Sequence, residues 1–496
     1  MAENSYNADP KDIVLRADID RSLRHPVMFF FTSGATWLAV AVVFGLIASV
    51  KKHSPEFLSG FSILDAGKID AAHMNALVYG WACQAAFGII IWLMARLSRQ
   101  ANRSTGLILL AGHIWNAAVM VGVLCVLFGY GSTGVPFMEF PAAIWPVLLL
   151  SYLMIVIGSL VNFKINKQGH VYISQWYLLG AMLWFPWVFV TAHLFVFVLN
   201  GHPLMDAAIA AWYKSALTLL FFIPVALAAA YYLTPKVTGR PVYSYSLAIY
   251  GFWALAVVAP WAGMQKLTGA PIPQFLPYVG AAATVLILIP AMAVGVNILS
   301  TIKGHGDIAI QSPSLRFTIS GIVCFVIFGV LGLFFNTAGA IRLTQFSLSG
   351  YGFDILAIYG VFSLCAYGAI YFIVPRITQR EWLSRRFINW HFYLSIYGII
   401  LVVGVGIVVG YMQGLASEAW DKPWKDAATL LFASSWGTTM AWIFLLTSNI
   451  FFCLHLLLMW ARLGRRSSHP TLLASSHGDS PHGPEGEIDN YGSANA

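Results

Sequence analysis

Apolar stretches of about 20 residues recur along nearly the whole chain, and they restrict its fold more than any other feature. A helix needs about 20 apolar residues to cross a lipid bilayer. Twelve such stretches occur, at roughly 27–50, 71–96, 105–129, 139–161, 171–199, 208–234, 243–263, 275–302, 317–340, 350–375, 388–413 and 430–461. Strand patterns are absent, so helices must satisfy the backbone hydrogen bonds in lipid. The sequence therefore predicts an all-α, polytopic membrane protein with twelve transmembrane helices.

The composition excludes several classes of soluble protein. Of the 496 residues, 59% are hydrophobic and 10% are charged, whereas soluble domains contain roughly 45–50% and 25%. A soluble enzyme, a nucleic-acid-binding module and a disordered chain do not fit these values. The five cysteines lie singly in apolar runs without a C-x-x-C motif, which argues against a disulfide scaffold and against a c-type haem attachment site.

The distribution of basic residues predicts how the spans are oriented. The two tails and the even-numbered loops together carry about three times as many Lys and Arg residues as the odd-numbered loops. Positively charged loops stay in the cytoplasm, so both termini are expected there. Three parts follow: a cytoplasmic N-terminal tail (1–26), a twelve-helix transmembrane domain (27–463), and a disordered cytoplasmic tail (464–496) rich in Ser, Gly, His and Pro.

Ionisable residues inside the spans mark the candidate functional site, because each costs several kcal/mol in the bilayer. The predicted orientation places His73, Lys214, Lys266 and Asp354 in the outer third of the membrane, within roughly one helical turn of a common depth. Two lysines and one aspartate at one depth are expected to pair inside the bundle. In the simpler interpretation the lysines snorkel to the outer surface and the histidine is a hydrogen-bonded interface residue. Asp354 is too short to snorkel far.

A series of short motifs in spans four to eleven carries a family resemblance. The motifs are Gly169–Tyr177, Tyr231–Lys236, Arg240–Leu247, Phe252–Leu255, Trp261–Gly263, Gly368–Arg376, Asn389–Phe392 and Met412–Gly414. In order and spacing they resemble subunit I of the cbb-type (C-family) haem–copper cytochrome c oxidases. The resemblance implies the subunit I bundle of twelve helices with cytoplasmic termini.

The resemblance also implies cofactors whose ligands this chain largely lacks. Members of the family reduce oxygen with electrons from cytochrome c and pump protons. They hold a low-spin haem between histidines of spans two and ten, a high-spin haem on another span-ten histidine, and copper on three histidines of spans six and seven beside a span-seven tyrosine. By position, the span-two ligand falls on His73. The other positions hold Ser215 (span six), Ala259 (the tyrosine), Gln265 and Lys266 (span seven), and Phe353, Asp354 and Ile355 (span ten).

Ser, Gln and Phe cannot replace imidazoles at copper or haem iron. We therefore expect no binuclear centre, no bound metal and no catalytic residue. The expected function is that of a structural, assembly or regulatory subunit of a respiratory electron-transport complex in the bacterial inner membrane. Its expected partners are lipid, other membrane subunits and a cytochrome c subunit, and no nucleic acid. A polar cluster of Lys214, Ser215, Gln265, Lys266 and Asp354 is expected to fill the vacated site.

Two other functions remain open from the sequence. The first is a redox subunit that binds one low-spin haem at His73, with a methionine or His113 as the second axial ligand. The second is a small-anion or proton-coupled transporter that reuses the old cavity. In that case Lys214 and Lys266 would attract the anion, and Asp354 would be the proton site.

Overall fold

The computed structural model describes residues 10–466, apart from short gaps at 132, 162, 164–170, 200–202, 305, 420–422, 424 and 465. The α-helices are α1 (Pro10–His53), α2 (Ala66–Asn75), α3 (Cys83–Ser98), α4 (Thr105–Leu127), α5 (Ile144–Leu160), α6 (Ile173–His193), α7 (Pro203–Leu217), α8 (Ile223–Thr238), α9 (Tyr245–Val258), α10 (Phe275–Leu286), α11 (Leu288–Thr301), α12 (Gly306–Gln311), α13 (Pro313–Phe335), α14 (Ala338–Thr344), α15 (Ser349–Ile355), α16 (Leu364–Thr378), α17 (Arg385–Glu418) and α18 (Lys425–Trp460).

Several spans also contain short segments of other helix types. The π-helical segments are η2 (Ala76–Ala82), η3 (Leu194–Val198), η4 (Thr218–Phe222) and η7 (Leu356–Ser363). The 3-10 segments are η1 (Ser62–Leu64), η5 (Ala259–Trp261) and η6 (Met264–Leu267). The fold class predicted from the sequence is confirmed, since the described residues are helical and form no strand beyond one bridge between Arg380 and Arg466.

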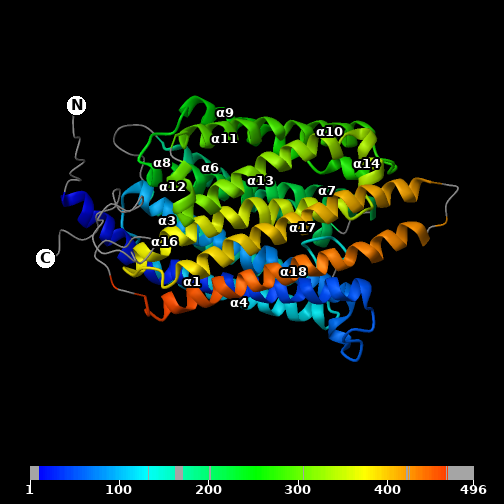
Figure 1. The fold of residues 1–496 in the computed structure, drawn as a ribbon, viewed down its shortest axis with the longest axis horizontal. Coiled ribbons are helices and arrows are strands. Elements are labelled where there is room, and N and C mark those ends of the chain that lie inside the picture. Colours follow the sequence, from blue (N-terminus) through cyan, green and yellow to red (C-terminus); the bar gives the residue numbers. More distant parts are fainter. Residues whose placement is uncertain are drawn as a thin grey trace.

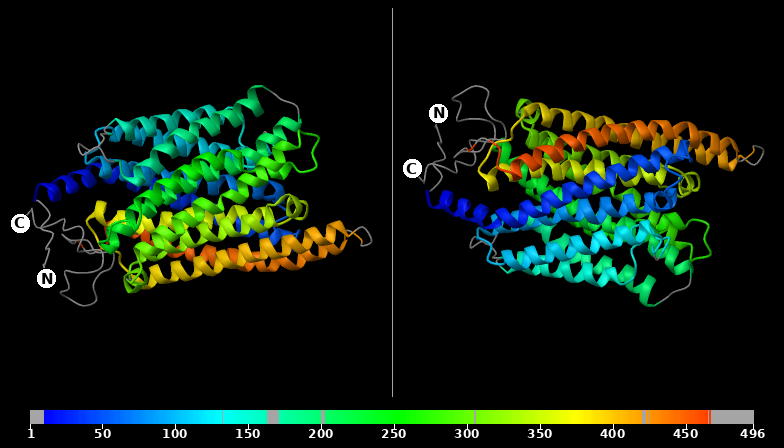
Figure 2. Two further views of the ribbon diagram at one scale, coloured as in Figure 1. Left: turned by 90° about the horizontal axis from the view of Figure 1, so that it is seen from above. Right: turned by 90° about the horizontal axis from the view of Figure 1, so that it is seen from below.

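The long helices run side by side in one elongated bundle (Figures 1 and 2). In the described part of the chain, eleven helices are long and apolar enough to cross a membrane. The predicted fourth span, 139–161, corresponds to the shorter apolar helix α5, which has 17 residues. The first turns of α1 and the last turns of α18 lie at the same end of the bundle (Figure 1), as an even number of crossings requires. The assignment of that end to the cytoplasm stays a prediction.

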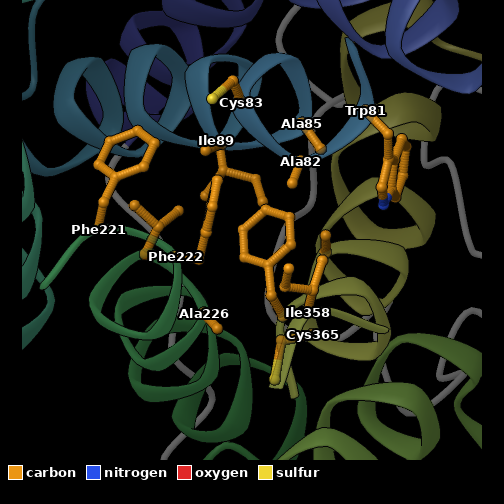
Figure 3. Packing of buried hydrophobic residues seen from close by; sticks show 14 of the residues in the cluster. Trp81, Ala82, Cys83, Ala85, Ile89, Phe221, Phe222, Ala226, Ile358 and Cys365 are labelled. Carbon is orange, nitrogen blue, oxygen red and sulfur yellow. The ribbon is translucent and has the colours of Figure 1, made fainter. Parts of the chain in front are cut away.

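Three spans form the centre of the bundle. The apolar windows of Ala66–Ser98 and Ser349–Thr378 are 100% buried and that of Pro203–Thr238 is 94% buried, whereas the other eight are 39–56% buried. Figure 3 shows side chains of these three spans facing one another, among them Ile89 and Ile358. The outer helices therefore shield spans two, six and ten from lipid, and these three spans carry most of the candidate residues.

Each central span contains a π-helical segment just after its candidate polar residue. The segments begin at Ala76, Thr218 and Leu356, which follow His73, Lys214 and Asp354 by at most four residues. A π-helical turn inserts an extra residue and rotates the side chains that flank it, and such turns occur frequently at functional sites. The three distortions therefore coincide with the residues that the sequence singles out.

Some predicted boundaries differ from the structure. Helix α1 begins at Pro10, so part of the predicted N-terminal tail (1–26) continues the first span as a helix. Span nine, predicted to reach 340, ends at Phe335, and the chain then forms the short helix α14. Except for Gly464 and Arg466, the predicted C-terminal tail lies outside the described residues.

Candidate functional site

An ion pair between spans six and ten forms the centre of the candidate site. Lys214 lies on α7 and Asp354 on α15, and Lys214 Nζ donates a hydrogen bond to Asp354 Oδ2 at 2.5 Å. Each side chain is only 17% exposed. A charge-assisted bond in such an environment is stronger than one in water. The pair therefore links two central helices directly.

A break in span seven brings two more polar residues to this pair. Pro260 lies in the 3-10 segment η5, and Gly263 has a left-handed φ of +106°. A Cβ atom at Gly263 would lie 2.4 Å from the Ala211 carbonyl oxygen, so only glycine fits where the chain passes α7. Beyond the break, Gln265 Oε1 accepts a hydrogen bond from the Gly263 amide at 2.9 Å. The turn places Gln265 and Lys266 beside span six.

All five residues of the predicted polar cluster line one cavity of about 80 Å³: Lys214, Ser215, Gln265, Lys266 and Asp354. The structure thus brings together side chains from spans six, seven and ten. The Lys266 ammonium lies close enough to Lys214 and Asp354 to interact electrostatically with both. The cavity has two cationic side chains and one anionic side chain in its lining.

The sequence interpretation missed the residues that close this cavity on one side. Asn336, Thr344 and Gln345 come from the segment that follows span nine, and all three line the cavity. Asn336 Oδ1 accepts a hydrogen bond from Gln265 Nε2 at 3.3 Å. The predicted span nine ran through to 340, which hid the turn at Asn336. The available signal was the polar run Asn336-Thr337 after an apolar span.

His73 lies apart from the cavity, against α1 and α18. Its ring is fully buried, its Nδ1 hydrogen-bonds with the Ala41 carbonyl oxygen at 2.7 Å, and its ring packs edge-on against Trp442 with centroids 4.8 Å apart. Its Nε2 is buried without a hydrogen-bond partner. A Cβ atom at Gly45 would lie 2.9 Å from the imidazole, so a glycine on α1 makes the space that the ring occupies.

His113, the alternative axial ligand, is remote from His73. It lies on the exposed side of α4 and stacks on Phe29 of α1 at 4.5 Å. Phe29 and Ala41, the α1 neighbours of the two histidines, are twelve residues apart on one helix, which corresponds to about 18 Å. The two imidazoles therefore do not face a common pocket in this structure.

The loop between α4 and α5 also contributes to a polar cluster next to span six. Tyr79 hydrogen-bonds with Tyr213 at 2.7 Å and donates to the Phe137 carbonyl oxygen at 2.6 Å. Asn75 donates to Glu139 Oε2 at 2.7 Å. Burial raises the pKa of Glu139 to about 7, although the hydrogen bond from Asn75 opposes this shift. These contacts hold the loop between α4 and α5 against spans two and six.

Comparison with known proteins identifies the class of this bundle. A solved structure of a heme-copper terminal oxidase dimer superposes with a TM-score of 0.70, covering 92% of this chain and 88% of the oxidase chain at 15% sequence identity. The chain has the fold of that oxidase class. Residues 25–443 match the family model "Cytochrome C and Quinol oxidase polypeptide I". Because the match covers most of the chain, the protein belongs to this family.

Curated relatives agree with this assignment. The cytochrome c oxidase subunit 1 of Rhodobacter capsulatus is 26% identical over 401 residues, which is 77% of this chain and 73% of the relative. The Cbb3-type cytochrome c oxidase subunit CcoN1 of Stutzerimonas stutzeri is 25% identical over 366 residues, which is 71% of this chain and 76% of the relative. The cytochrome c oxidase subunit 1 homolog of Azorhizobium caulinodans is 23% identical over 403 residues, covering 77% and 71%.

The side chains in the cavity do not fit the copper ion and high-spin haem that the family implies. Copper in proteins takes imidazole or sulfur ligands, whereas the cavity offers lysines, hydroxyls, amides and one carboxylate. Within the described parts of the chain, no three His, Cys, Asp or Glu residues lie close enough to hold a metal. A cavity of about 80 Å³ is also much smaller than the roughly 300–1,000 Å³ of typical ligand and cofactor pockets.

The low-spin haem has a donor atom in this structure but no room. The unpartnered Nε2 of His73 is the kind of atom that ligates haem iron. Yet the ring has zero solvent exposure, so not even a water-sized space adjoins it. Between spans two and ten, fully buried Trp81 donates a hydrogen bond from Nε1 to Ser363 Oγ at 2.8 Å. Side chains therefore pack tightly around His73 and between Trp81 and Ser363.

Proposed function

We propose that this subunit I-like membrane protein lacks the binuclear haem–copper centre and acts as a non-catalytic subunit of a respiratory electron-transport complex, in a structural, assembly or regulatory role. The Lys214–Asp354 ion pair carries this proposal. Asp354 stands between the two span-ten positions where the family places histidines, and Lys214 stands next to the copper position of span six. Fixed side-chain charges thus take the place of metal charge.

The ion pair accounts for how a metal-free centre remains stable. Metal ions are often the largest local charges in a site, and their loss leaves a polar cavity deep in the bundle. An unpaired charge there costs several kcal/mol, whereas a hydrogen-bonded pair of opposite sign offsets much of that cost. The small polar cavity that remains is large enough for a few water molecules.

The proposal also covers the membrane, the orientation of the chain and its partner subunits. We place the chain in the bacterial inner membrane with both termini in the cytoplasm, which the distribution of Lys and Arg supports. The relatives are named as subunits of oxidases, so its partners are other membrane subunits of such a complex, including a cytochrome c subunit. Exposed apolar side chains along the outer helices, such as Leu183 and Ile400, suit contact with lipid or with such subunits.

A second candidate function rests on the unpartnered Nε2 of His73. A redox subunit with one low-spin haem would use this nitrogen as an axial ligand. The haem would require Trp442 and neighbouring side chains to move away from the imidazole, because the present packing leaves no space there. The second axial ligand would also have to come from a residue other than His113.

The visible spectrum of the purified chain separates the two candidates. Under the proposed function, neither oxidised nor dithionite-reduced protein shows a Soret band attributable to this chain, and His73→Ala leaves the spectrum unchanged. The chain should be expressed with its membrane partners and then separated from any cytochrome c subunit. Sharp reduced-minus-oxidised bands at about one haem per chain, lost in His73→Ala, would replace the proposed function with the redox candidate.

A further inference from the structure

We propose that the cavity between spans six, seven and ten is a binding site for one small monovalent inorganic anion, such as chloride, held by Lys266 together with Lys214. The inference rests on the proposed function, since a haem or copper ion would occupy the same space. Four observations support it: the charge balance of the cavity, the hydrogen-bond donors in its lining, its size and its partial exposure.

The charged side chains that line the cavity do not balance. They are Lys214, Lys266 and Asp354, and the only carboxylate among them already pairs with Lys214 at 2.5 Å. Among the described residues, no carboxylate lies within ion-pair distance of Lys266. Two ammonium groups at this depth repel each other, and an unpaired charge is costly there. One bound monovalent anion would bring the cavity to neutrality.

Several hydrogen-bond donors lie in the lining of the cavity. They include the Ser215 hydroxyl and the Lys266 ammonium. Asn336 also lines the cavity, and its Oδ1 already accepts a hydrogen bond from Gln265 Nε2. The Gln345 Oε1 atom is a buried acceptor without a hydrogen-bond partner. The two ammonium groups and the hydroxyl suit an anion better than a cation.

The size and exposure of the cavity restrict the ligand to a small ion that can exchange. A volume of about 80 Å³ accommodates a few water-sized particles, since one such particle needs about 10–15 Å³ by this measure. A halide with one or two waters fits, whereas an organic cofactor does not. Lys214 and Asp354 each remain 17% exposed, so the cavity is not sealed from its surroundings.

Chloride binding can be tested on the full-length protein in detergent. The thermal midpoint is measured at constant ionic strength while gluconate, which is too large for the cavity, is replaced by chloride up to about 100 mM. A ligand that binds only the folded state raises the midpoint, and we expect a rise of about 2–4 °C. Retention of radioactive chloride measured in parallel should give about one ion per chain.

Matched lysine variants locate the ion. Lys266→Gln removes the surplus charge and should abolish both the chloride-dependent shift and the retained chloride. The control is Lys68→Gln, because Lys68 lies at the outer end of span two, hydrogen-bonds to the Ser62 carbonyl oxygen and does not line the cavity. This control should behave like the wild type.

Three results would overturn the inference. They are a wild-type midpoint that does not respond to chloride, no retained chloride, and retained chloride that persists in Lys266→Gln. Haem and copper contents of the same sample separate this failure from failure of the proposed function. A metal-free and haem-free protein without bound chloride refutes the anion site alone, whereas a protein loaded with haem or copper refutes the proposed function itself.

Discussion

Asp354→Asn removes the only negative charge among the described residues that line the cavity, and we predict a marked loss of stability. The carboxylate lies 2.5 Å from Lys214 Nζ, and both side chains are 17% exposed. Removal of one partner of a buried ion pair costs about 3–5 kcal/mol, and partial screening by the polar cavity reduces this to about 2–3 kcal/mol. In a chain of this size, such a loss lowers the thermal midpoint by about 2–3 °C.

A double-mutant cycle shows whether the loss comes from the ion pair. Lys214→Gln with Asp354→Asn removes both charges, so the double variant should regain most of the lost stability. Asp65→Asn is the matched control, because Asp65 forms an exposed ion pair with Lys68, and exposed pairs contribute little. Midpoints are read from scanning fluorimetry and from the monomer peak after heating. An Asp354→Asn protein that melts within 1 °C (about 1 kcal/mol or less) of the wild type would refute the reasoning.

Three further predictions follow from individual side chains. Burial raises the pKa of Glu139 to about 7, whereas an unfolded Glu titrates near about 4.3. The raised pKa of Glu139 therefore contributes stability to the folded protein. This contribution is fully present below about pH 4 and is lost as the pH rises through about 7. Glu139→Gln should flatten the dependence of the thermal midpoint on pH between about 5 and 8, and an unchanged profile would contradict this. Gly263→Ala should lower the free energy of unfolding by about 3 kcal/mol or more, because the new methyl group would clash with the Ala211 carbonyl. The control Gly269→Ala is also at positive φ but in open space, so it should cost only about 1–2 kcal/mol. Equal decreases of the thermal midpoint in the two variants would refute the close approach of Gly263 to Ala211. His73→Gln should lower the free energy of unfolding by about 1–2 kcal/mol, because the hydrogen bond to the Ala41 carbonyl oxygen is lost. The variant should leave the visible spectrum unchanged, so loss of a Soret band would identify His73 as a haem ligand.

Most of the fold could be predicted from the sequence, because a chain in lipid must satisfy its backbone hydrogen bonds internally. Helices in a bilayer need long apolar stretches, so the spans could be located from hydropathy alone. Their ends were harder to locate. The break at Gly263 and the turn at Asn336 depend on contacts with other spans. Likewise, α1 extends back to Pro10, because a polar helix outside the membrane has no hydropathy signal.

The sequence predicted the charged residues of the candidate site but not the residues that close the cavity on one side. Charged residues are so rare in the spans that Lys214, Lys266 and Asp354 stood out, and a shared depth predicted that they would meet. His73 is predicted at the same depth, yet it packs against Trp442, because depth does not specify the direction in which a side chain points. Asn336 and Gln345 were missed because polar residues in a loop carry no such signal.

The copper content of the purified chain tests the central claim most directly. Copper in this family belongs to the binuclear centre, so the measured copper content does not depend on haem that partner subunits carry. The chain should be produced in copper-replete medium, separated from its partners without chelators, and analysed by elemental mass spectrometry. We predict that copper stays far below one atom per chain and does not differ between the wild type and Ser215→Ala. About one copper atom per chain would contradict it.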